Sequence, residues 1–322
     1  MTMMQPGLRG RHFLEIRDLT SAQLRHLLDL SVAYKSALKE GRETPTLKGK
    51  SLALIFEKSS TRTRVSFDVG MFQMGGHTVN LLPNDMQLGR GETVPDTARV
   101  LSRYVDAVML RTDMPRKMTE LAAHASIPVI NGLTDDSHPC QIVADILTYE
   151  EHRGPIAGKV IGWSGDANNL VVSWAEAAMR LGFEFRIGCP PELPPPAWLT
   201  DWIASEQAAG STGQVTVVHD AKTALEGADC VVTDTWTSMH QEGDGVPRHQ
   251  LLAPFQVDEA LMAVAKDDAL FMHCLPAHRG EEVTDGVIEG RHSVVFDEAE
   301  NRLHSQKAIL HWCLLGDAPL SV

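Results

Sequence analysis

The hydrophobic positions of the chain fall into short continuous runs that alternate with helical patterns. In the first half these runs are rich in β-branched residues and bounded by turn residues, which predicts strands buried on both faces. They are SLALIF at 51–56, HTVNLL at 77–82, AVMLR at 107–111 and PVINGL at 128–133. Apolar residues recur at helical spacing in the segments between and before them, at about 20–39, 64–74, 93–104, 115–125 and 139–152. A repeating strand–helix order predicts a parallel sheet.

The alternation restarts after the Gly- and Pro-containing stretch HRGPIAGK at 152–159, which is the best candidate for a linker. The later strands are predicted at VIGW 160–163, EFRIG 184–188, VTVVH 215–219, CVVTD 230–234, ALFMH 269–273 and SVVFD 293–297. A last helix is expected at about 304–315. The fold class predicted is therefore α/β, with two doubly wound parallel-sheet domains facing across a cleft. The domains are expected to span 1–150 and 151–303, with a C-terminal helix at 304–322 joining the first.

Composition narrows the classes of function. The chain has 322 residues, 43% of them hydrophobic, and a net charge of −13, which argues against nucleic acid or an anionic membrane as a partner. Its five cysteines are scattered, odd in number and without a CxxC pair, which indicates a reducing compartment rather than a disulfide scaffold. The N-terminus lacks the apolar stretch of a signal peptide, and no run reaches membrane-spanning length. We expect a cytoplasmic protein.

The junction between the first strand and its helix carries the clearest chemical signal. The strand SLALIF runs into EKSSTRTR, and Val65, Val69 and Phe72 then follow at helical spacing. The hydroxyls and Arg62 therefore lie at a helix N-terminus, where free N–H groups and the dipole favour an anion. The alternative is an ordinary N-cap with Arg62 and Arg64 solvated. Cations in a first turn oppose the dipole, so the phosphate interpretation is favoured.

Other polar clusters follow the remaining predicted strands. In the first half these are Gln87 after the second strand, Arg111 at the end of the third and HPCQ at 138–141 after the fourth. In the second half they are GDANN at 165–169, DTWTSM at 234–239 and HCLPAHRG at 273–280. All lie at the carboxyl ends of strands, which is the edge where parallel α/β sheets bind ligands. The pattern predicts that each domain supplies half of one site.

HPCQ is a helix start, because Pro139 suits the first helical position. His138 and Gln141 then project near a helix N-terminus and can donate to a carbonyl or amide-like group. Taken alone, His138 is more simply a helix cap. Its position on the same sheet edge as Arg62 and Arg111 favours the functional interpretation.

GDANNL follows a strand and opens a helix, but it lacks the glycines of the GxGxxG dinucleotide fingerprint. Asn168 and Asn169 can hold an amino-acid head group or merely cap the helix. In DTWTSM, Asp234 can pair with an ammonium and Ser238 with a carboxylate. A simple Asx-type turn is the alternative there.

HCLPAHRGEEV gathers His273, Cys274, His278 and Arg279 around a proline. A metal site is a weaker interpretation, since no pair has recognisable zinc spacing, and we predict no metal and no cofactor. A nucleophilic Cys274 would need a base and an activated thiolate. Arg302 is either a further basic contributor or a solvated charge.

Taken together, these segments resemble the aspartate/ornithine transcarbamylase family, and specifically its ornithine branch. The segments that carry the resemblance occur in the family's order: FEKSSTRTR, MQLGRGE, DTARVLSRYVDA, NGLTDDSHPCQ, DTWTSM, HCLPAHRGEEVTD and FDEAENR. The resemblance implies a carbamoyl-phosphate-binding domain followed by an ornithine-binding domain. It also implies a homotrimer, or a multiple of trimers, with sites near subunit interfaces.

The resemblance implies transfer of the carbamoyl group of carbamoyl phosphate to the δ-amine of L-ornithine, which gives citrulline and phosphate. The residues that would bind carbamoyl phosphate are Ser60, Thr61, Arg62, Thr63, Gln87, Arg111, His138, Gln141, Cys274, Leu275 and Arg302. Those that would bind L-ornithine are Asn169, Asp234, Ser238 and Met239. The catalytic residues implied are Arg62, Arg111, His138 and Cys274.

Two positions depart from the family pattern: His240 replaces the glycine of its SMG triplet, and Ala167 stands before the paired asparagines. Both lie on the ornithine side. A carbamoyltransferase for a different amine acceptor, such as acetylornithine, succinylornithine or putrescine, is therefore also compatible with the sequence. A Rossmann-type dehydrogenase and a non-catalytic metabolite-binding relative are two further possibilities.

Overall fold

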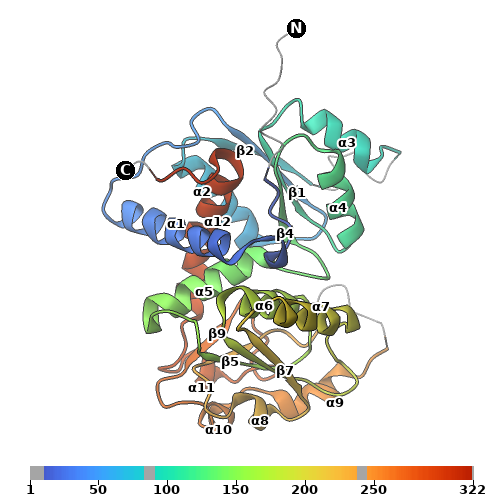
Figure 1. Ribbon diagram of the computed structural model, residues 1–322, viewed down its shortest axis with the longest axis vertical. Coiled ribbons are helices and arrows are strands. Elements are labelled where there is room, and N and C mark those ends of the chain that lie inside the picture. The colour runs from blue at the N-terminus through green and yellow to red at the C-terminus, as the bar shows by residue number, and fades with distance from the viewer. Residues whose placement is uncertain (1–10, 83–90, 238–244, 321–322) are drawn as a thin grey trace. The chain divides into compact units, whose positions relative to one another are not determined.

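The structure is a computed structural model that describes residues 11–82, 91–237 and 245–320. Three of the predicted site residues, Gln87, Ser238 and Met239, lie outside the described residues. The chain divides into two compact units (Figure 1). Unit 1 is Met1–Val143 with Arg302–Val322, and unit 2 is Ala144–Asn301. The two boundaries between the units, at 143/144 and 301/302, both fall inside helices. The predicted linker at 152–159 lies within unit 2.

Unit 1 is built on a four-stranded sheet in which every pairing is parallel. Its strands are β1 (Ser51–Phe56), β2 (His77–Leu81), β3 (Ala107–Arg111) and β4 (Val129–Leu133), in the order β2-β1-β3-β4. β1 and β3 are almost wholly buried, as their continuous apolar sequences require. Phe56 pairs with Arg111 at the last step of the β1–β3 register, so both strands end at the same sheet edge.

The helices of unit 1 cover both faces of this sheet. They are α1 (Ser21–Lys39), α2 (Thr61–Gln73), α3 (Val94–Leu101), α4 (Pro115–His124), the start of α5 (Pro139–Arg153) and most of α12 (Val295–Leu315), with a short 3-10 turn at Ile16–Asp18. α3 and α4 pack their apolar sides on Ile55 and Leu110 of the sheet. Figure 1 shows α2 and α12 on the opposite side. Gly70 of α2 lies against Leu303 and Lys307 of α12.

Unit 2 has a five-stranded parallel sheet in the order β7-β6-β5-β8-β9. Its strands are β5 (Val160–Ser164), β6 (Glu184–Gly188), β7 (Gln214–Val218), β8 (Cys230–Thr233) and β9 (Leu270–His273). Its helices, besides the end of α5 and the start of α12, are α6 (Asn169–Leu181), α7 (Ala197–Ala208), α8 (Ala221–Leu225), α9 (Arg248–Leu252), α10 (Glu259–Met262) and α11 (Asp285–Ile288), with a 3-10 turn at Ala253–Phe255. Two sheets with parallel strands and helices on both faces confirm the predicted α/β class.

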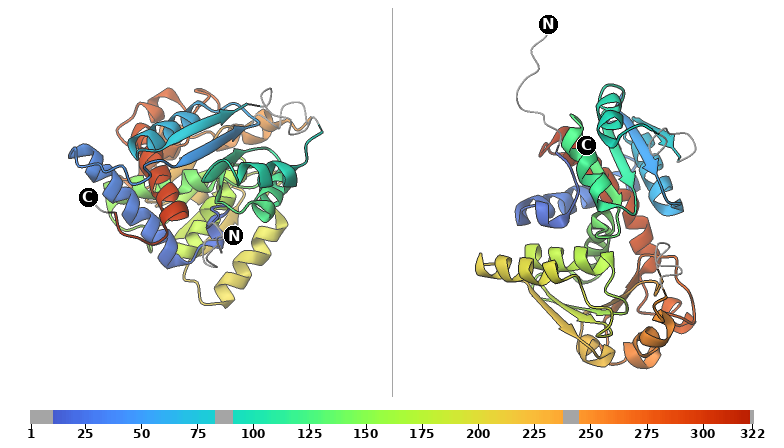
Figure 2. Two further views of the ribbon diagram at one scale, coloured as in Figure 1. Left: turned by 90° about the horizontal axis from the view of Figure 1, so that it is seen from above. Right: turned by 90° about the vertical axis from the view of Figure 1, so that its right-hand side faces the viewer.

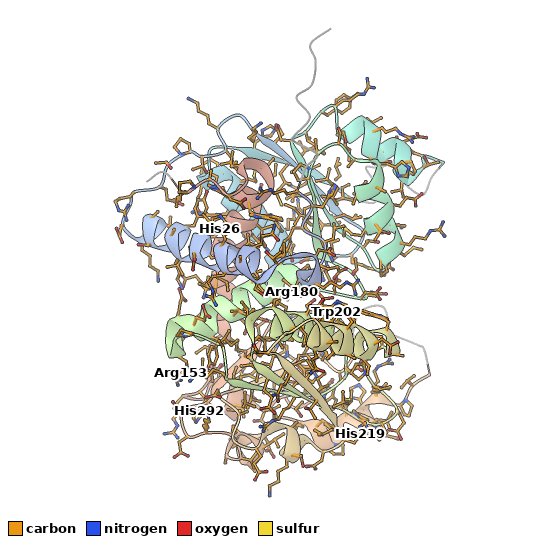
Figure 3. All side chains as sticks on the ribbon, in the orientation of Figure 1. His26, Arg153, Arg180, Trp202, His219 and His292 are labelled. Carbon is orange, nitrogen blue, oxygen red and sulfur yellow. The ribbon has the colours of Figure 1, made fainter. Side chains whose placement is uncertain are left out.

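The two faces of the unit 2 sheet carry different helices. α8, α10 and α11 enclose one core around Val231 and Phe271. On the other face, Trp174 of α6 stacks on Phe185 of β6 with ring centroids 6.0 Å apart. α6 and α7 lie on this same side of the sheet (Figure 2). They are joined by Arg180, which pairs with Glu206 and lies over the ring of Trp202 at 5.5 Å (Figure 3).

Each sheet reverses its winding direction once. In unit 1 the reversal lies between β1 and β3, and in unit 2 it lies between β5 and β8. Right-handed crossovers that leave a strand in opposite directions put their helices on opposite faces, so the loops at the carboxyl ends diverge there. Ligands of parallel α/β sheets bind at such points. Ser60 to Thr63 and Arg111 lie at the first of these points. Asn168 and Asp234 lie at the second.

Two predicted elements differ from the structure. The run SVVFD at 293–297 is not a strand: Ser293 makes only an isolated bridge to Phe271, and α12 begins at Val295, well before the predicted position 304. A short β-branched run cannot be told from a buried helix start by periodicity alone. The second difference concerns α2, which begins at Thr61 and buries Phe67 and Met71.

The apolar residues that predicted this helix, Val65, Val69 and Phe72, face outward, and Phe72 is 79% exposed. The predicted helix is therefore confirmed, and its apolar stripe points away from the core of its own unit.

The five cysteines are all within the described residues and are free thiols. Among the described helices none is both long and apolar enough to cross a lipid bilayer.

Candidate active site

The N-terminus of α2 is built to receive an anion. Ser60 is the residue before the helix, in extended conformation, and its side chain makes no capping hydrogen bond. An ordinary side-chain cap is therefore not what the structure shows. The first-turn N–H groups of Thr61, Arg62 and Thr63 have no intrahelical carbonyl to bind. A negatively charged group at this point would gain those donors and the helix dipole together.

Two guanidinium groups are fixed beside this helix start. Arg111 is 9% exposed at the end of β3, and its Nη1 donates to Ser60 Oγ at 3.3 Å. Arg302 of α12 is 3% exposed; its Nη1 donates to Gln141 Oε1 at 2.5 Å and its Nη2 to Thr63 Oγ1 at 3.0 Å. The planar fork is thus held by residues from two other helices. Arg302 is accordingly not a solvated charge.

His138 lies just before α5 and is nearly fully buried. Burial, together with the positive charges of Arg302, Arg111 and Arg62, holds the pKa of His138 well below its usual 6.5. The imidazole is therefore neutral at physiological pH and can donate or accept a hydrogen bond without adding charge. Pro139 begins α5 as predicted, and the apolar residues Ile142 and Val143 behind it are buried.

In unit 2, Asn168 performs two tasks. Its Oδ1 accepts from the N–H of Leu170 at 2.9 Å and caps α6, while its Nδ2 donates to Asp234 Oδ2 at 2.7 Å. The helix-cap interpretation was therefore right, and the same side chain also orients a carboxylate on the neighbouring strand end. Asn169, the first residue of α6, lies half-buried beside it.

Cys274 follows β9 and faces Asp234. Its Sγ donates to Asp234 Oδ1 at 3.2 Å. Burial and the nearby charge of Asp234 raise the pKa of Cys274 well above its usual value of 9.0. The thiol is protonated, so it is neither an activated nucleophile nor a ready metal ligand. This geometry supports a thiol that orients Asp234 by a hydrogen bond.

A buried pair that the sequence patterns did not assign to the site fixes the backbone after Cys274. His273 Nδ1 accepts from the N–H of Leu275 at 2.9 Å, so its proton is on Nε2, which donates to Glu282 Oε1 at 3.1 Å. Leu275 has a φ of +55°, a region that residues with side chains rarely adopt. Glu298 of α12 accepts from the N–H of His273 at 2.9 Å. The only sequence signal was the presence of these glutamates inside the HCLPAHRGEE and FDEAENR segments.

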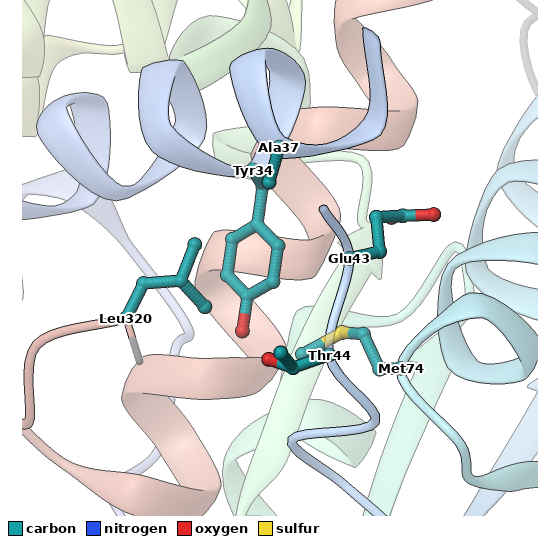
Figure 4. Close-up of a pocket in the computed structure, with 6 residues that line it drawn as sticks. All are labelled: Tyr34, Ala37, Glu43, Thr44, Met74 and Leu320. Carbon is teal, nitrogen blue, oxygen red and sulfur yellow. The ribbon is translucent and has the colours of Figure 1, made fainter. Parts of the chain in front are cut away.

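The described site residues thus form two groups. The group of unit 1 contains Ser60, Thr61, Arg62, Thr63, Arg111, His138, Gln141 and Arg302. The group of unit 2 contains Asn169, Asp234, Cys274 and Leu275, with Asn168, His273 and Glu282 as supports. None of the predicted site residues that the structure describes lines the small depression in unit 1 shown in Figure 4, which is bordered by Tyr34, Ala37, Glu43, Thr44, Met74 and Leu320.

Fold and site together define a two-domain α/β protein with a phosphate-type anion site in one domain and a carboxylate–thiol cluster in the other. The chain belongs to the aspartate/ornithine carbamoyltransferase family. The family model for the carbamoyl-P binding domain matches residues 11–151, and the model for the Asp/Orn binding domain matches residues 157–313.

Individual relatives agree with this assignment. The chain is 58% identical over 306 residues to the ornithine carbamoyltransferase of Nitrobacter winogradskyi, with 94% of this chain and 97% of the relative covered. It is 56% identical over 304 residues to that of Agrobacterium fabrum, with 94% and 98% covered. Among solved structures, the ornithine carbamoyltransferase from Pyrococcus furiosus superimposes with a TM-score of 0.92 at 46% identity, covering 96% of this chain and 98% of that one.

Glu15 is a further titratable group close to the unit 1 site. It is hydrogen-bonded to the side chain of Ser137, the residue before His138, and burial raises the pKa of Glu15 to about 7. The native state therefore holds the Glu15 proton more tightly than the unfolded chain, whose value lies near 4.5. The stability that this proton confers is complete below the unfolded value and lost as pH rises through the folded one.

Glu15→Gln should remove this pH dependence, because the amide stays neutral. Relative to the native chain, the free energy of unfolding of the variant should rise by about 2 kcal/mol between pH 5 and pH 8. Urea unfolding at both pH values measures the difference. A constant difference between variant and native chain across that range would show that Glu15 titrates normally.

Proposed function

We propose that this protein transfers the carbamoyl group of carbamoyl phosphate to the δ-amine of L-ornithine, giving L-citrulline and phosphate. The observation that carries the proposal is the set of buried guanidinium groups fixed at the N-terminus of α2, where Arg302 is held by Gln141 and Thr63 and Arg111 by Ser60. A dianionic phosphate is the group that such donors bind best. The names of the relatives, ornithine carbamoyltransferases, support the same donor and acceptor.

In this proposal residues 1–150 and the C-terminal helix bind carbamoyl phosphate, and residues 151–303 bind ornithine. Ser60, Thr61, Arg62 and Thr63 bind the phosphate, with Gln87 and Gln141 completing the pocket. Arg111 and His138 lie near the carbamoyl oxygen. Asp234 receives the amine, and Asn169, Ser238 and Met239 hold the rest of ornithine. The reaction needs both groups of residues, so the expectation that the two sheet edges face each other is part of the proposal.

The chemistry follows from where charge develops. The neutral δ-amine attacks the carbonyl carbon, a C–N bond forms, and the C–O bond to phosphate breaks. Negative charge grows on the carbonyl oxygen and on the departing phosphate, and fixed donors from Arg62, Arg111 and Thr63 stabilise both. Neutral His138 donates without repelling the guanidinium groups.

The amine must lose a proton to react, because its ordinary pKa is about 10. Asp234, oriented by Asn168 and Cys274, attracts and positions the ammonium form. The ammonium gives up this first proton to solvent before the attack, and the departing phosphate accepts the second proton, which the nitrogen loses as the C–N bond forms. A protonated Cys274 thiol fits an orienting role better than that of a base.

A citrulline-formation assay tests the proposed reaction. With carbamoyl phosphate as donor, kcat/KM should be at least about 100-fold higher for L-ornithine than for acetylornithine, succinylornithine, putrescine or aspartate, since a site with placed polar groups rejects acceptors that leave them unpaired. Preference for another amine would shift the acceptor assignment. Absence of product with every acceptor would favour a non-catalytic relative, and binding of a nicotinamide nucleotide would favour a dehydrogenase.

Arg62→Ala and Asp234→Ala should fail in different ways. Loss of Arg62 removes a transition-state donor, so kcat should fall by about 10²–10³-fold. Loss of Asp234 should raise KM for ornithine by about 10-fold or more and leave carbamoyl-phosphate binding within about twofold. Steady-state kinetics and calorimetry distinguish the two effects. Arg64→Ala, on the exposed side of the same first turn, is the matched control and should be close to normal. Equal damage to both substrates in Asp234→Ala would contradict the division of roles.

We further propose that the protein is a cytoplasmic homotrimer, or a multiple of trimers, in which Gln87 comes from a neighbouring subunit. The outward face of α2 supports an assembly. Val65, Val69 and Phe72 are 53%, 37% and 79% exposed on one side of this helix, and Val79 on the edge strand β2 is 40% exposed. Side chains at this spacing form a continuous apolar stripe that favours burial against another chain. The free cysteines suit a reducing compartment.

Phe72→Glu should break the assembly, because a charge would have to be buried in the interface. Light scattering should show three chains of 35.3 kDa for the native protein and a smaller species for the variant. Phe296→Glu is the matched control, since Phe296 is 64% exposed on another helix. An unchanged mass in Phe72→Glu, or dissociation of the control alone, would contradict the proposed interface.

A further inference from the structure

The turn that follows the Cys274 segment carries titratable side chains that the proposed reaction does not use. It spans His278 to Glu282 in unit 2, between β9 and α11. Hydrogen bonds fix its backbone from both sides: the N–H of Glu281 donates to His278 O at 2.9 Å, and the N–H of Val257 donates to Glu282 O at 2.9 Å. Gln256 Nε2 donates to Glu281 O at 2.6 Å. The positions of these side chains are therefore set by a rigid backbone.

Three potential ligand atoms converge above this turn. One nitrogen of His278 and one carboxylate oxygen each of Glu281 and Glu282 all lie within 4.8 Å of one another. His278 Nδ1 is 3.8 Å from Glu281 Oε2 and 4.0 Å from Glu282 Oε2. These separations are too long for direct hydrogen bonds. They are close to the spacing of about 3.3 Å between ligands at 2.0–2.1 Å from a tetrahedral zinc ion, so a small side-chain movement would suffice.

Glu282 supplies the second, independent observation. Its side chain is fully buried, and its Oε1 already accepts from His273 Nε2 at 3.1 Å and from the N–H of His278 at 2.6 Å. Its Oε2 is also buried and has no hydrogen-bond partner among the described residues. A buried carboxylate oxygen without a donor is costly. This oxygen faces the ring of His278, and a cation between them would satisfy it.

We propose that His278, Glu281 and Glu282 form a binding site for a divalent metal ion of the zinc class. An imidazole nitrogen with two carboxylate oxygens suits Zn²⁺, Co²⁺ or Ni²⁺ better than Mg²⁺ or Ca²⁺, which prefer oxygen ligands throughout. His249 of α9 lies 3.8 Å from Glu281 through its Nδ1 and is placed to add a fourth ligand. The neighbouring Arg279 does not oppose the ion, because its guanidinium pairs with Asp285 and Glu289 at 2.7 Å and 2.6 Å.

A second cluster, Asp234, His273 and Cys274, also brings three ligand types together, but its geometry favours hydrogen bonding. Asp234 accepts from Asn168 and from the thiol of Cys274, and both ring nitrogens of His273 are engaged. Metal binding there would break these hydrogen bonds and require loss of the thiol proton. The His278 site needs neither.

Metal binding can be measured without any assay of activity, so the test is independent of the proposed function. The full-length protein, treated with EDTA and desalted, is titrated calorimetrically with ZnCl₂, and CoCl₂ binding is followed by visible absorption. We expect one ion per chain with micromolar affinity. Tm should rise by about 5 °C at zinc concentrations about 100-fold above Kd. His278→Ala and Glu281→Gln should each weaken binding by about 10-fold or more, and the double variant should abolish it.

Three variants serve as controls. Glu192→Gln removes an exposed carboxylate elsewhere in unit 2, and His124→Gln removes an exposed imidazole of unit 1; neither should change the affinity. Cys274→Ser reports on the second cluster and should also leave the affinity unchanged. Undiminished binding in the folded His278→Ala/Glu281→Gln variant, loss of binding in Cys274→Ser alone, or no binding of Zn²⁺ or Co²⁺ by the native chain up to millimolar concentration would each overturn the proposal.

Discussion

The electrostatic field at the start of α2 governs the arrangement of the unit 1 site. Arg302 is buried there, and burial of a guanidinium is costly unless its donors are satisfied. Gln141 and Thr63 accept from its two Nη atoms and hold the fork in one orientation. The cost of gathering like charges is visible at His138. Burial and the three guanidinium groups lower the pKa of this imidazole. A bound dianion would offset that repulsion, which is consistent with the proposed phosphate site.

Helix α12, which carries Arg302, belongs to both units of the chain. It begins in unit 2, where Glu298 accepts from the N–H of His273, and it continues in unit 1, where Arg302 begins the second part. Glu298, which supports the Cys274 segment, and Arg302, which carries the guanidinium fork, thus belong to the same helix. In unit 2, Glu282 also has two roles. Its Oε1 accepts a hydrogen bond from His273, and its Oε2 faces the proposed metal site. Changes at Glu282 should thus affect both features together.

The periodicity of the sequence was sufficient for the parallel sheets, because strands buried on both faces must be continuously apolar and βα units can close only with right-handed crossovers. It also placed Ser60, Arg111 and Asp234 at the carboxyl edges, since that follows from chain direction alone. The same periodicity could not say what an exposed apolar face contacts. Val65 and Phe72 showed helical spacing, yet a pattern cannot say whether an apolar stripe faces the core of its own domain or another chain.

The order of residues along the chain was enough to establish the fold class, the sheet edge at which the candidate site residues lie and the family to which the chain belongs. The folded molecule was needed to learn which distant side chains meet, such as Arg302 with Thr63 and Asn168 with Asp234. Local patterns reflect the burial of each segment, whereas a hydrogen bond between side chains far apart in sequence depends on how the helices pack. The protonation states of His138 and Cys274 likewise follow from burial and from charges that the fold brings near.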